Sequence, residues 1–169
     1  MSDSKLGIYD QSLYMIHNRL FFRLFQVGNS LDRQCLNELG ISPVHWAVMG
    51  ALSRPHLNDA GMSFSDLTEY LGISRQSLDN VLKRLEREGS VQRVTSHQDK
   101  RAKNVALTPF GQQSWLNLQE QFFQFYHQAM SGFALDDLAS LIHLLNKLNT
   151  GLKQIHLAQP DADTHEDDV

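Results

Sequence analysis

The sequence has one cysteine, Cys35, and no long apolar run. A single cysteine excludes an internal disulfide framework and is typical of a reducing compartment. No apolar run approaches the roughly 18 residues that a membrane span requires. The first residues, MSDSKLGIYDQS, lack the basic and apolar regions of a signal peptide. We therefore expect a cytoplasmic protein with no membrane partner.

Motifs of enzymes and of metal sites are also missing. The chain has no Gly-x-Ser-x-Gly, no P-loop and no dinucleotide fingerprint, and SDSK at Ser2–Lys5 matches Ser-x-x-Lys only by accident. Its eight histidines form no close His-x₃-His pair, and no Cys-x₂-Cys occurs. We expect no catalytic residues, no cofactor and no metal site.

Positive charge is scarce overall but concentrated locally. The formal net charge is -4, which does not by itself predict a nucleic-acid partner. Residues 75–103 nevertheless hold eight Lys/Arg against four Asp/Glu, whereas the remainder holds seven against fifteen. A basic segment on an acidic protein is either a solvated helix face or a local electrostatic footprint for a polyanion.

The first half of the chain is predicted to be helical. Apolar residues at spacings of three and four predict one long helix over 10–39, which Gly40 ends. Ser42 as N-cap and Pro43 at the first position open a second helix. Ser63 with Asp66 resembles a capping box for a short third helix that ends near Gly72.

The second half adds a hairpin and two more helices. Ser74 caps a fourth helix that Gly89 closes, and the segments 90–95 and 104–108 alternate as two short strands. Thr108 and Pro109 begin a helix that extends to about residue 130. A last helix begins at Leu135, and its leucines form a nearly heptad seam over 138–155.

This order predicts a mainly α fold with a winged helix-turn-helix. The N-terminal residues of the second helix in such a motif reach base edges in the major groove. Arg75 can offer a guanidinium fork to guanine, and Gln76 or Asn80 can pair with adenine. The proposed contacts of this helix, which include hydroxyls suited to phosphate, are Ser74, Arg75, Gln76, Ser77, Asn80 and Arg84.

The hairpin tip carries a second group of candidate contacts. A wing lies over the minor groove, where an inserted arginine gains from concentrated negative potential. Arg101 is the candidate for insertion, and Asp99 would orient it by a charge-assisted pair. Lys100, Lys103 and His97 would be phosphate contacts.

These two segments resemble the MarR family of regulators. DKRAKNVALTPFG is similar to the family's wing signature, Asp-x-Arg followed by five residues and Leu-Thr, here Asp99, Arg101, Leu107 and Thr108. LGISRQSLDNVLKRLEREG resembles its recognition helix, and GISPVHWAVMGAL its second helix. The resemblance covers about residues 10–157. Ser90 departs from the pattern, since the family commonly has a large apolar residue there.

The resemblance implies a homodimer that binds double-stranded DNA at a pseudo-palindromic operator, usually as a repressor. It implies a helical dimerisation region at 8–40 and 109–157 and a DNA-binding domain at 41–108. The remaining segment, 158–169, is polar and acidic, and we expect it to be a disordered tail.

A small-molecule effector is the expected signal. The family's effectors generally lie between the dimerisation helices and the winged helix, where aromatic walls with one cation would suit an aromatic carboxylate or its CoA thioester. The matching residues are His17, Arg23, His45, Trp46 and Trp115. Each aromatic among them could instead belong to the core, and Arg23 could instead pair with an acidic side chain of a partner subunit.

Two alternatives remain open at this stage. Cys35 could act as an oxidation sensor, although the family's peroxide sensors carry their cysteine near the beginning of the first helix and Cys35 lies near its end. A winged helix could also serve as a protein-interaction module without specific DNA binding, because a fold does not determine its partner.

Overall fold

The computed structural model describes residues 11–57, 60–96 and 102–157. The predictions for His97, Asp99, Lys100, Arg101 and the 158–169 tail lie outside the described residues. The chain divides into two compact units, Met1–Tyr126 and His127–Val169. Helices dominate both units, which confirms the mainly α prediction.

The long first helix is present, with a change near its end. Helix α1 (Gln11–Gln34) passes into a π-helical turn at Cys35–Leu39. Gly40 then ends the helix in the left-handed conformation at φ 68°, as predicted. The wider turn was not expected, because hydrophobic spacing does not distinguish a helix terminus with i to i+5 bonds from an α-helix.

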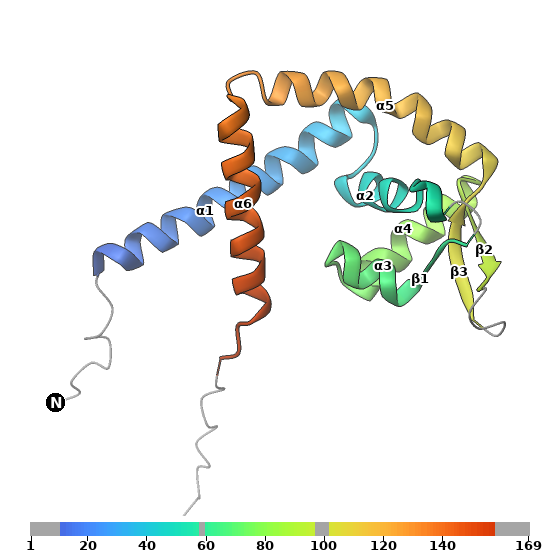
Figure 1. The fold of residues 1–169 in the computed structure, drawn as a ribbon, viewed down its shortest axis with the longest axis horizontal. Helices are drawn as coiled ribbons and strands as arrows, with labels where there is room; N and C mark the ends of the chain where they lie inside the picture. The colour runs from blue at the N-terminus through green and yellow to red at the C-terminus, as the bar shows by residue number, and fades with distance from the viewer. Residues whose placement is uncertain (1–10, 58–59, 97–101, 158–169) are drawn as a thin grey trace, which may run out of the picture. The chain divides into compact units, whose positions relative to one another are not determined.

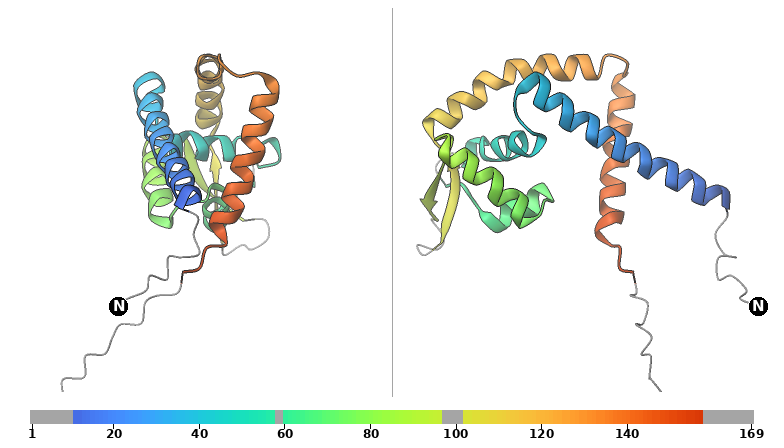
Figure 2. Two further views of the ribbon diagram at one scale, coloured as in Figure 1. Left: turned by 90° about the vertical axis from the view of Figure 1, so that its left-hand side faces the viewer. Right: turned by 180° about the vertical axis from the view of Figure 1, so that it is seen from behind.

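Three short helices follow, and the predicted caps begin each of them. The Oγ of Ser42 accepts a hydrogen bond from the N–H of His45 (3.3 Å) at the start of α2 (Pro43–Leu52). Ser63 caps α3 (Phe64–Leu71) and Ser74 caps α4 (Arg75–Arg87) in the same way. Figure 1 shows α2, α3 and α4 gathered beside the strands, and the views in Figure 2 show the same grouping.

The strands form a three-stranded antiparallel sheet in the order β1-β3-β2. Strands β2 (Val91–Thr95) and β3 (Lys103–Leu107) make the predicted hairpin, with Val91 opposite Leu107. Strand β1 (Met62–Ser63), which pairs with the other edge of β3, was not predicted. A strand of two residues is too short to show an alternation of apolar and polar side chains, so only its pairing with β3 reveals it.

Leucines from the helix-turn-helix form the core of the first unit. Leu67, Leu78, Leu82 and Leu85 are fully buried and pack with Val105 of β3. This arrangement fixes α4 against the sheet by its apolar face. Its polar face is consequently left to the solvent.

The two long C-terminal helices are where the sequence placed them. Helix α5 (Pro109–Ala129) directly follows Thr108, whose Oγ1 accepts a hydrogen bond from Gly111 N–H at 2.9 Å. Helix α6 (Leu135–Lys153) begins at Leu135. A short 3₁₀ helix, Pro55–Leu57, lies in a segment that was read as a loop. No helix among the described residues has the length and apolarity needed to cross a membrane.

Candidate DNA interface and aromatic pocket

The outward face of α4 carries most of the predicted DNA contacts. Leu78, Leu82 and Leu85 face the core and are completely buried. The opposite face is polar and exposed. It comprises Arg75, Gln76, Ser77, Asn80 and Arg84, together with the N-cap residue Ser74.

Hydrogen bonds and ion pairs order this face. The Oγ of Ser74 accepts from the N–H of Ser77 (3.1 Å), and its hydroxyl donates to the Ser77 hydroxyl (3.0 Å). Arg84 Nε donates to Glu88 Oε1 at 2.7 Å, and the ammonium of Lys83 lies 2.7 Å from Asp79. Such exposed pairs contribute little stability, so Arg84 remains available to an incoming phosphate.

Arg75 is positioned by an aromatic ring. Its guanidinium carbon lies 5.1 Å from the centroid of Phe64, the first residue of α3. Stacking on a ring leaves the in-plane N–H donors of the guanidinium unobstructed. The first turn of α4 therefore presents an oriented donor fork.

Hydrogen bonds join the two strands of the wing in its described part. The N–H of Ser96 donates to the carbonyl of Ala102 at 3.0 Å, which closes the ladder toward the tip. The ammonium of Lys103 donates to Thr95 Oγ1 on the opposite strand at 2.9 Å. The remaining tip candidates, Asp99, Lys100 and Arg101, lie beyond the described segments.

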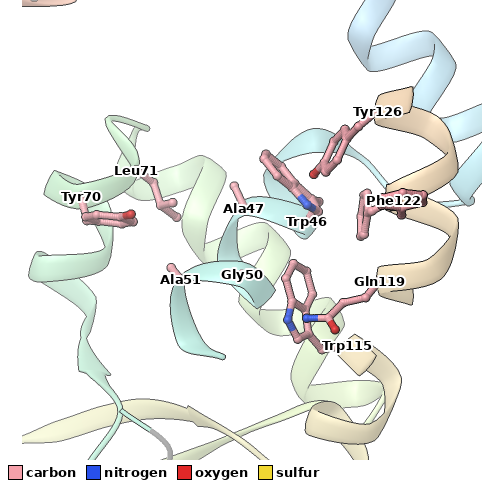
Figure 3. A pocket seen from close by; sticks show the side chains of 11 residues that line it. Trp46, Ala47, Gly50, Ala51, Tyr70, Leu71, Trp115, Gln119, Phe122 and Tyr126 are labelled. Carbon is pink, nitrogen blue, oxygen red and sulfur yellow. The ribbon is translucent and has the colours of Figure 1, made fainter. Parts of the chain in front are cut away.

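An apolar pocket of about 600 Å³ lies between α2, the end of α3 and α5 (Figure 3). Both tryptophans of the chain, Trp46 and Trp115, line it. The other lining residues are Ala47, Gly50, Ala51, Tyr70, Leu71, Gln119, Phe122, Phe123 and Tyr126. Cavities of this size and character are typical of small organic ligands.

The aromatic rings contact one another at one end of the pocket. The Phe122 centroid lies 5.8 Å from Trp46, from Trp115 and from Tyr126. Burial raises the pKa of the Tyr126 phenol, and a side-chain hydrogen bond with Trp46 opposes that rise. A neutral phenol therefore stands beside the rings and supplies one of the few polar groups of a mostly apolar wall.

The structure brings two of the five predicted effector residues into this pocket. Trp46 and Trp115 line it, whereas His17 and Arg23 are exposed on α1 and Arg23 donates to Gln26 at 2.8 Å. His45 does not line the pocket either and is buried in the core. Arg23 lies on α1, which is uncovered in the single chain, so its part in effector binding stays a prediction.

His45 is an unusual core residue. Burial lowers the pKa of its imidazole, with Glu88 opposing and Arg84 adding to the effect. Its Nδ1 is buried without a hydrogen-bond partner among the described residues. The side chain is thus held neutral in the folded domain.

Cys35 is also a core residue. It is buried at 4% exposure and packs with Leu39, Ile41 and Phe122. Burial raises the pKa of its thiol, and the charge of Asp32 adds to that rise. A buried thiol with a raised pKa is a poor target for peroxide.

Comparison with known proteins decides the family. Residues 39–102 match the MarR family model. Over 142 residues the chain is 37% identical to the transcriptional activatory protein BadR of Rhodopseudomonas palustris, covering 82% of this chain and 81% of that protein. The chain belongs to the MarR family. It is therefore a transcription regulator with a winged-helix DNA-binding domain, and not an enzyme.

Other MarR-family proteins are similar along most of the chain. The homoprotocatechuate degradative operon repressor of Escherichia coli is 28% identical, covering 78% of this chain and 88% of that protein. The crystal structure of the MepR–DNA complex of S. aureus shares the fold, with a TM-score of 0.60, 21% identity, and coverage of 88% and 99% of the two chains.

Sequence reasoning missed most of the pocket wall. Tyr70 comes from α3, Phe122 and Tyr126 come from α5, and none of the three was singled out. One signal was present: Trp115, Phe122 and Tyr126 recur at spacings of seven and four, which places them on one face of α5. Tyr70, which α3 contributes, had no such periodic signal in the sequence.

Proposed function

We propose that this MarR-family chain acts as a homodimer that binds a pseudo-palindromic operator and represses transcription until an organic effector binds. The observation that carries the proposal is the exposed polar face of α4, anchored by three fully buried leucines on its other side. A two-fold dimer presents two such helices, so its operator needs two related half-sites.

Uncovered apolar helices support the dimer. No residue of α1 or α6 is buried in the single chain. Large apolar side chains such as Ile16, Phe25 and Ile142 are more than 60% exposed. An exposed apolar face on each of these helices favours a covering partner, and a second copy provides the same surfaces.

Each predicted DNA contact has a proposed role. Arg75 and Gln76 read base edges from the first turn of α4, and Asn80 follows one turn later. Ser74, Ser77 and Arg84 hold phosphates, as do Lys100 and Lys103 of the wing. Asp99 orients Arg101 for insertion into the minor groove.

The aromatic pocket supports an aromatic effector. Its wall is built from Trp46, Trp115, Phe122 and Tyr126, which favour a flat apolar ligand by stacking. One relative is named for repression of a homoprotocatechuate degradative operon, and homoprotocatechuate is an aromatic carboxylate. An aromatic carboxylate or its CoA thioester is therefore the proposed class.

A gel shift tests the DNA-binding part. The dimer should retard the intergenic DNA upstream of its own gene, and affinity should fall steeply as salt rises because phosphate contacts release counterions. Absence of binding, or binding insensitive to salt, would favour a protein-interaction module. A size-exclusion run with light scattering checks the dimer.

Intrinsic fluorescence tests the effector part. Since both tryptophans line the pocket, any ligand there should change the tryptophan emission. The same compound should release the operator in the gel shift if the protein is a repressor. Tighter operator binding with the compound would indicate activation, the mode named for BadR.

The burial of Cys35 argues against oxidation as the signal. Treatment with peroxide at concentrations that oxidise exposed thiols should leave operator binding unchanged, and Cys35→Ser should behave in the same way.

A further inference from the structure

Phe64 is the first residue of α3 and follows β1 without a break. Ser63, the last residue of β1, pairs with Asn104 of the wing strand β3. Figure 1 shows β1 leading out of the sheet into α3, which packs against α4. Phe64 therefore lies where the sheet of the wing is joined to the helix-turn-helix.

Three contacts fix the position of the Phe64 ring. The side chain is half-buried and packs against the hydrophobic core of the winged helix. The carbonyl of Phe64 accepts a hydrogen bond from Thr68 Oγ1 at 2.7 Å, and the Oγ of Ser63 accepts one from the N–H of Asp66 at 3.1 Å. A ring anchored by core packing and by a capped first turn is a rigid surface for a neighbouring side chain.

Arg75 lies against this ring and not against a carboxylate. Its guanidinium carbon is 5.1 Å from the Phe64 centroid. Asp79, one turn later on α4, has the spacing of an i,i+4 partner for Arg75, yet its carboxylate takes the ammonium of Lys83 at 2.7 Å. Arg75 belongs to none of the ion pairs formed within the described segments. Its charge and its in-plane N–H donors are consequently left for a ligand.

We propose that Phe64 is a positioning residue that determines base specificity, because it holds the Arg75 fork in the plane needed to pair with guanine. This inference rests on the proposed function, in which Arg75 reads a base edge. A bidentate contact to O6 and N7 of guanine requires two donors in one plane, and discrimination against other bases depends on that geometry. The attraction between the guanidinium and the ring face maintains the plane, and the ring itself does not touch the base.

Removal of the ring would free Arg75 in two ways. The side chain would gain rotamers that it must give up again when it binds a base. It would also come within reach of Asp79, since the two residues are one helical turn apart. Both effects weaken the pairing of Arg75 with guanine and leave the contacts of other residues unchanged.

Base-preference profiles of the full-length dimer test the proposal. The wild type first selects a binding duplex from a pool of random-sequence DNA. Competition gel shifts with single-base variants of that duplex then give the discrimination at each position. Arg75→Ala identifies the base pair that Arg75 reads, as the position at which discrimination falls.

Phe64→Leu is the decisive variant, because leucine keeps an apolar side chain against the core and lacks the ring. It should lower discrimination about two- to fivefold at the base pair read by Arg75, the fold-change equivalent to a cation–π contact at an exposed site. Discrimination at the other positions and the salt dependence of binding should stay as in the wild type.

Two further variants are the controls. Phe64→Tyr retains an aromatic face and should retain the wild-type profile. Phe110→Leu makes the same substitution at a phenylalanine that is 60% exposed in the first turn of α5, and it should also leave the profile unchanged. Urea unfolding of each variant checks that the domain is intact. A general loosening of α4 would instead lower discrimination at every position that this helix reads.

A double variant separates positioning from direct contact. In an Arg75→Ala background the ring has no guanidinium to hold, so the addition of Phe64→Leu should change neither the profile nor the affinity. A further loss in that background would show that Phe64 contacts DNA itself and would overturn the proposal.

The outcomes distinguish this inference from the proposed function. If Arg75→Ala lowers discrimination at one base pair and Phe64→Leu does not, base reading stands and the positioning role of Phe64 is overturned. An equal loss at every position, or an equal loss in Phe64→Tyr and Phe64→Leu, overturns that role as well. If the dimer selects no sequence from the pool, or Arg75→Ala leaves the profile unchanged, base reading by Arg75 fails and the role of Phe64 with it.

Discussion

Gly111 approaches Ser90 so closely that a Cβ at position 111 would lie 1.9 Å from the Ser90 carbonyl oxygen. The same carbonyl accepts a hydrogen bond from the N–H of Thr108 at 3.0 Å. The wing and the start of α5 are therefore joined backbone to backbone. Ser90 is buried at this crossing, where a small residue fits and a large apolar side chain is not required.

The first prediction follows from this contact. Gly111→Ala should lower the free energy of unfolding by about 1–3 kcal/mol, the usual cost of overpacking, because backbone must move to admit the methyl group. Urea unfolding followed by circular dichroism measures it. Gly132→Ala is the control, since no atom lies within 4 Å of a Cβ built there. Equal stability of the two variants would contradict the conclusion that the close approach of Gly111 to the Ser90 carbonyl leaves no room for a methyl group.

The second prediction concerns pH. The folded-state pKa of His45 lies below its unfolded value of about 6.5, because burial disfavours the imidazolium. The unfolded chain then binds more protons as the pH falls below about 6.5, so stability declines on acidification and is unaffected well above that value. His45→Gln should remove this part of the decline in urea unfolding between pH 7.5 and 5.5. An unchanged pH slope would show that other groups cause it.

The third prediction tests base reading by α4. Arg75→Ala or Gln76→Ala should cost about 1–3 kcal/mol at particular operator positions and relax base preference there. Competition gel shifts with single-base operator variants measure the effect. Arg87→Ala, elsewhere on the same helix, should preserve the preference profile. A uniform loss across all operator variants would assign Arg75 and Gln76 to phosphates instead.

The fourth prediction tests the wing. Arg101→Ala should weaken operator binding substantially while leaving the dimer folded, since an arginine inserted in the minor groove contributes through local potential. Lys103→Ala should instead reduce the slope of log K against log salt by about one, as for a single phosphate contact. Arg101→Ala with wild-type affinity at physiological salt would exclude the insertion.

Local signals account for what could be predicted. The N-caps Ser42, Ser63 and Ser74 were recognisable because each accepts a hydrogen bond from a backbone N–H three residues later. The polar face of α4 followed from leucines at helical spacing. The order of helices and hairpin, and hence the winged helix, followed from these boundaries.

The site depended on contacts that no local pattern encodes. Phe64 and Arg75 lie on different helices, so their stacking had no periodic signal. Arg23 was a candidate effector cation because its neighbours are apolar, and α1, which carries it, has no buried residue in the single chain. An apolar stripe indicates that a surface will be covered, and it does not indicate by what.

The sequence by itself determined where the caps of α2, α3 and α4 lie, which face of α4 is polar, and the MarR-like wing signature, because these properties depend on residues within one or two turns of each other. Tertiary structure alone decided which aromatics form a pocket, that His45 and Cys35 are buried, and that Gly111 must lack a side chain. Those features arise where helices and strands that are distant in the sequence pack together. Such packing depends on the shape and volume of the side chains and not on their spacing along the chain.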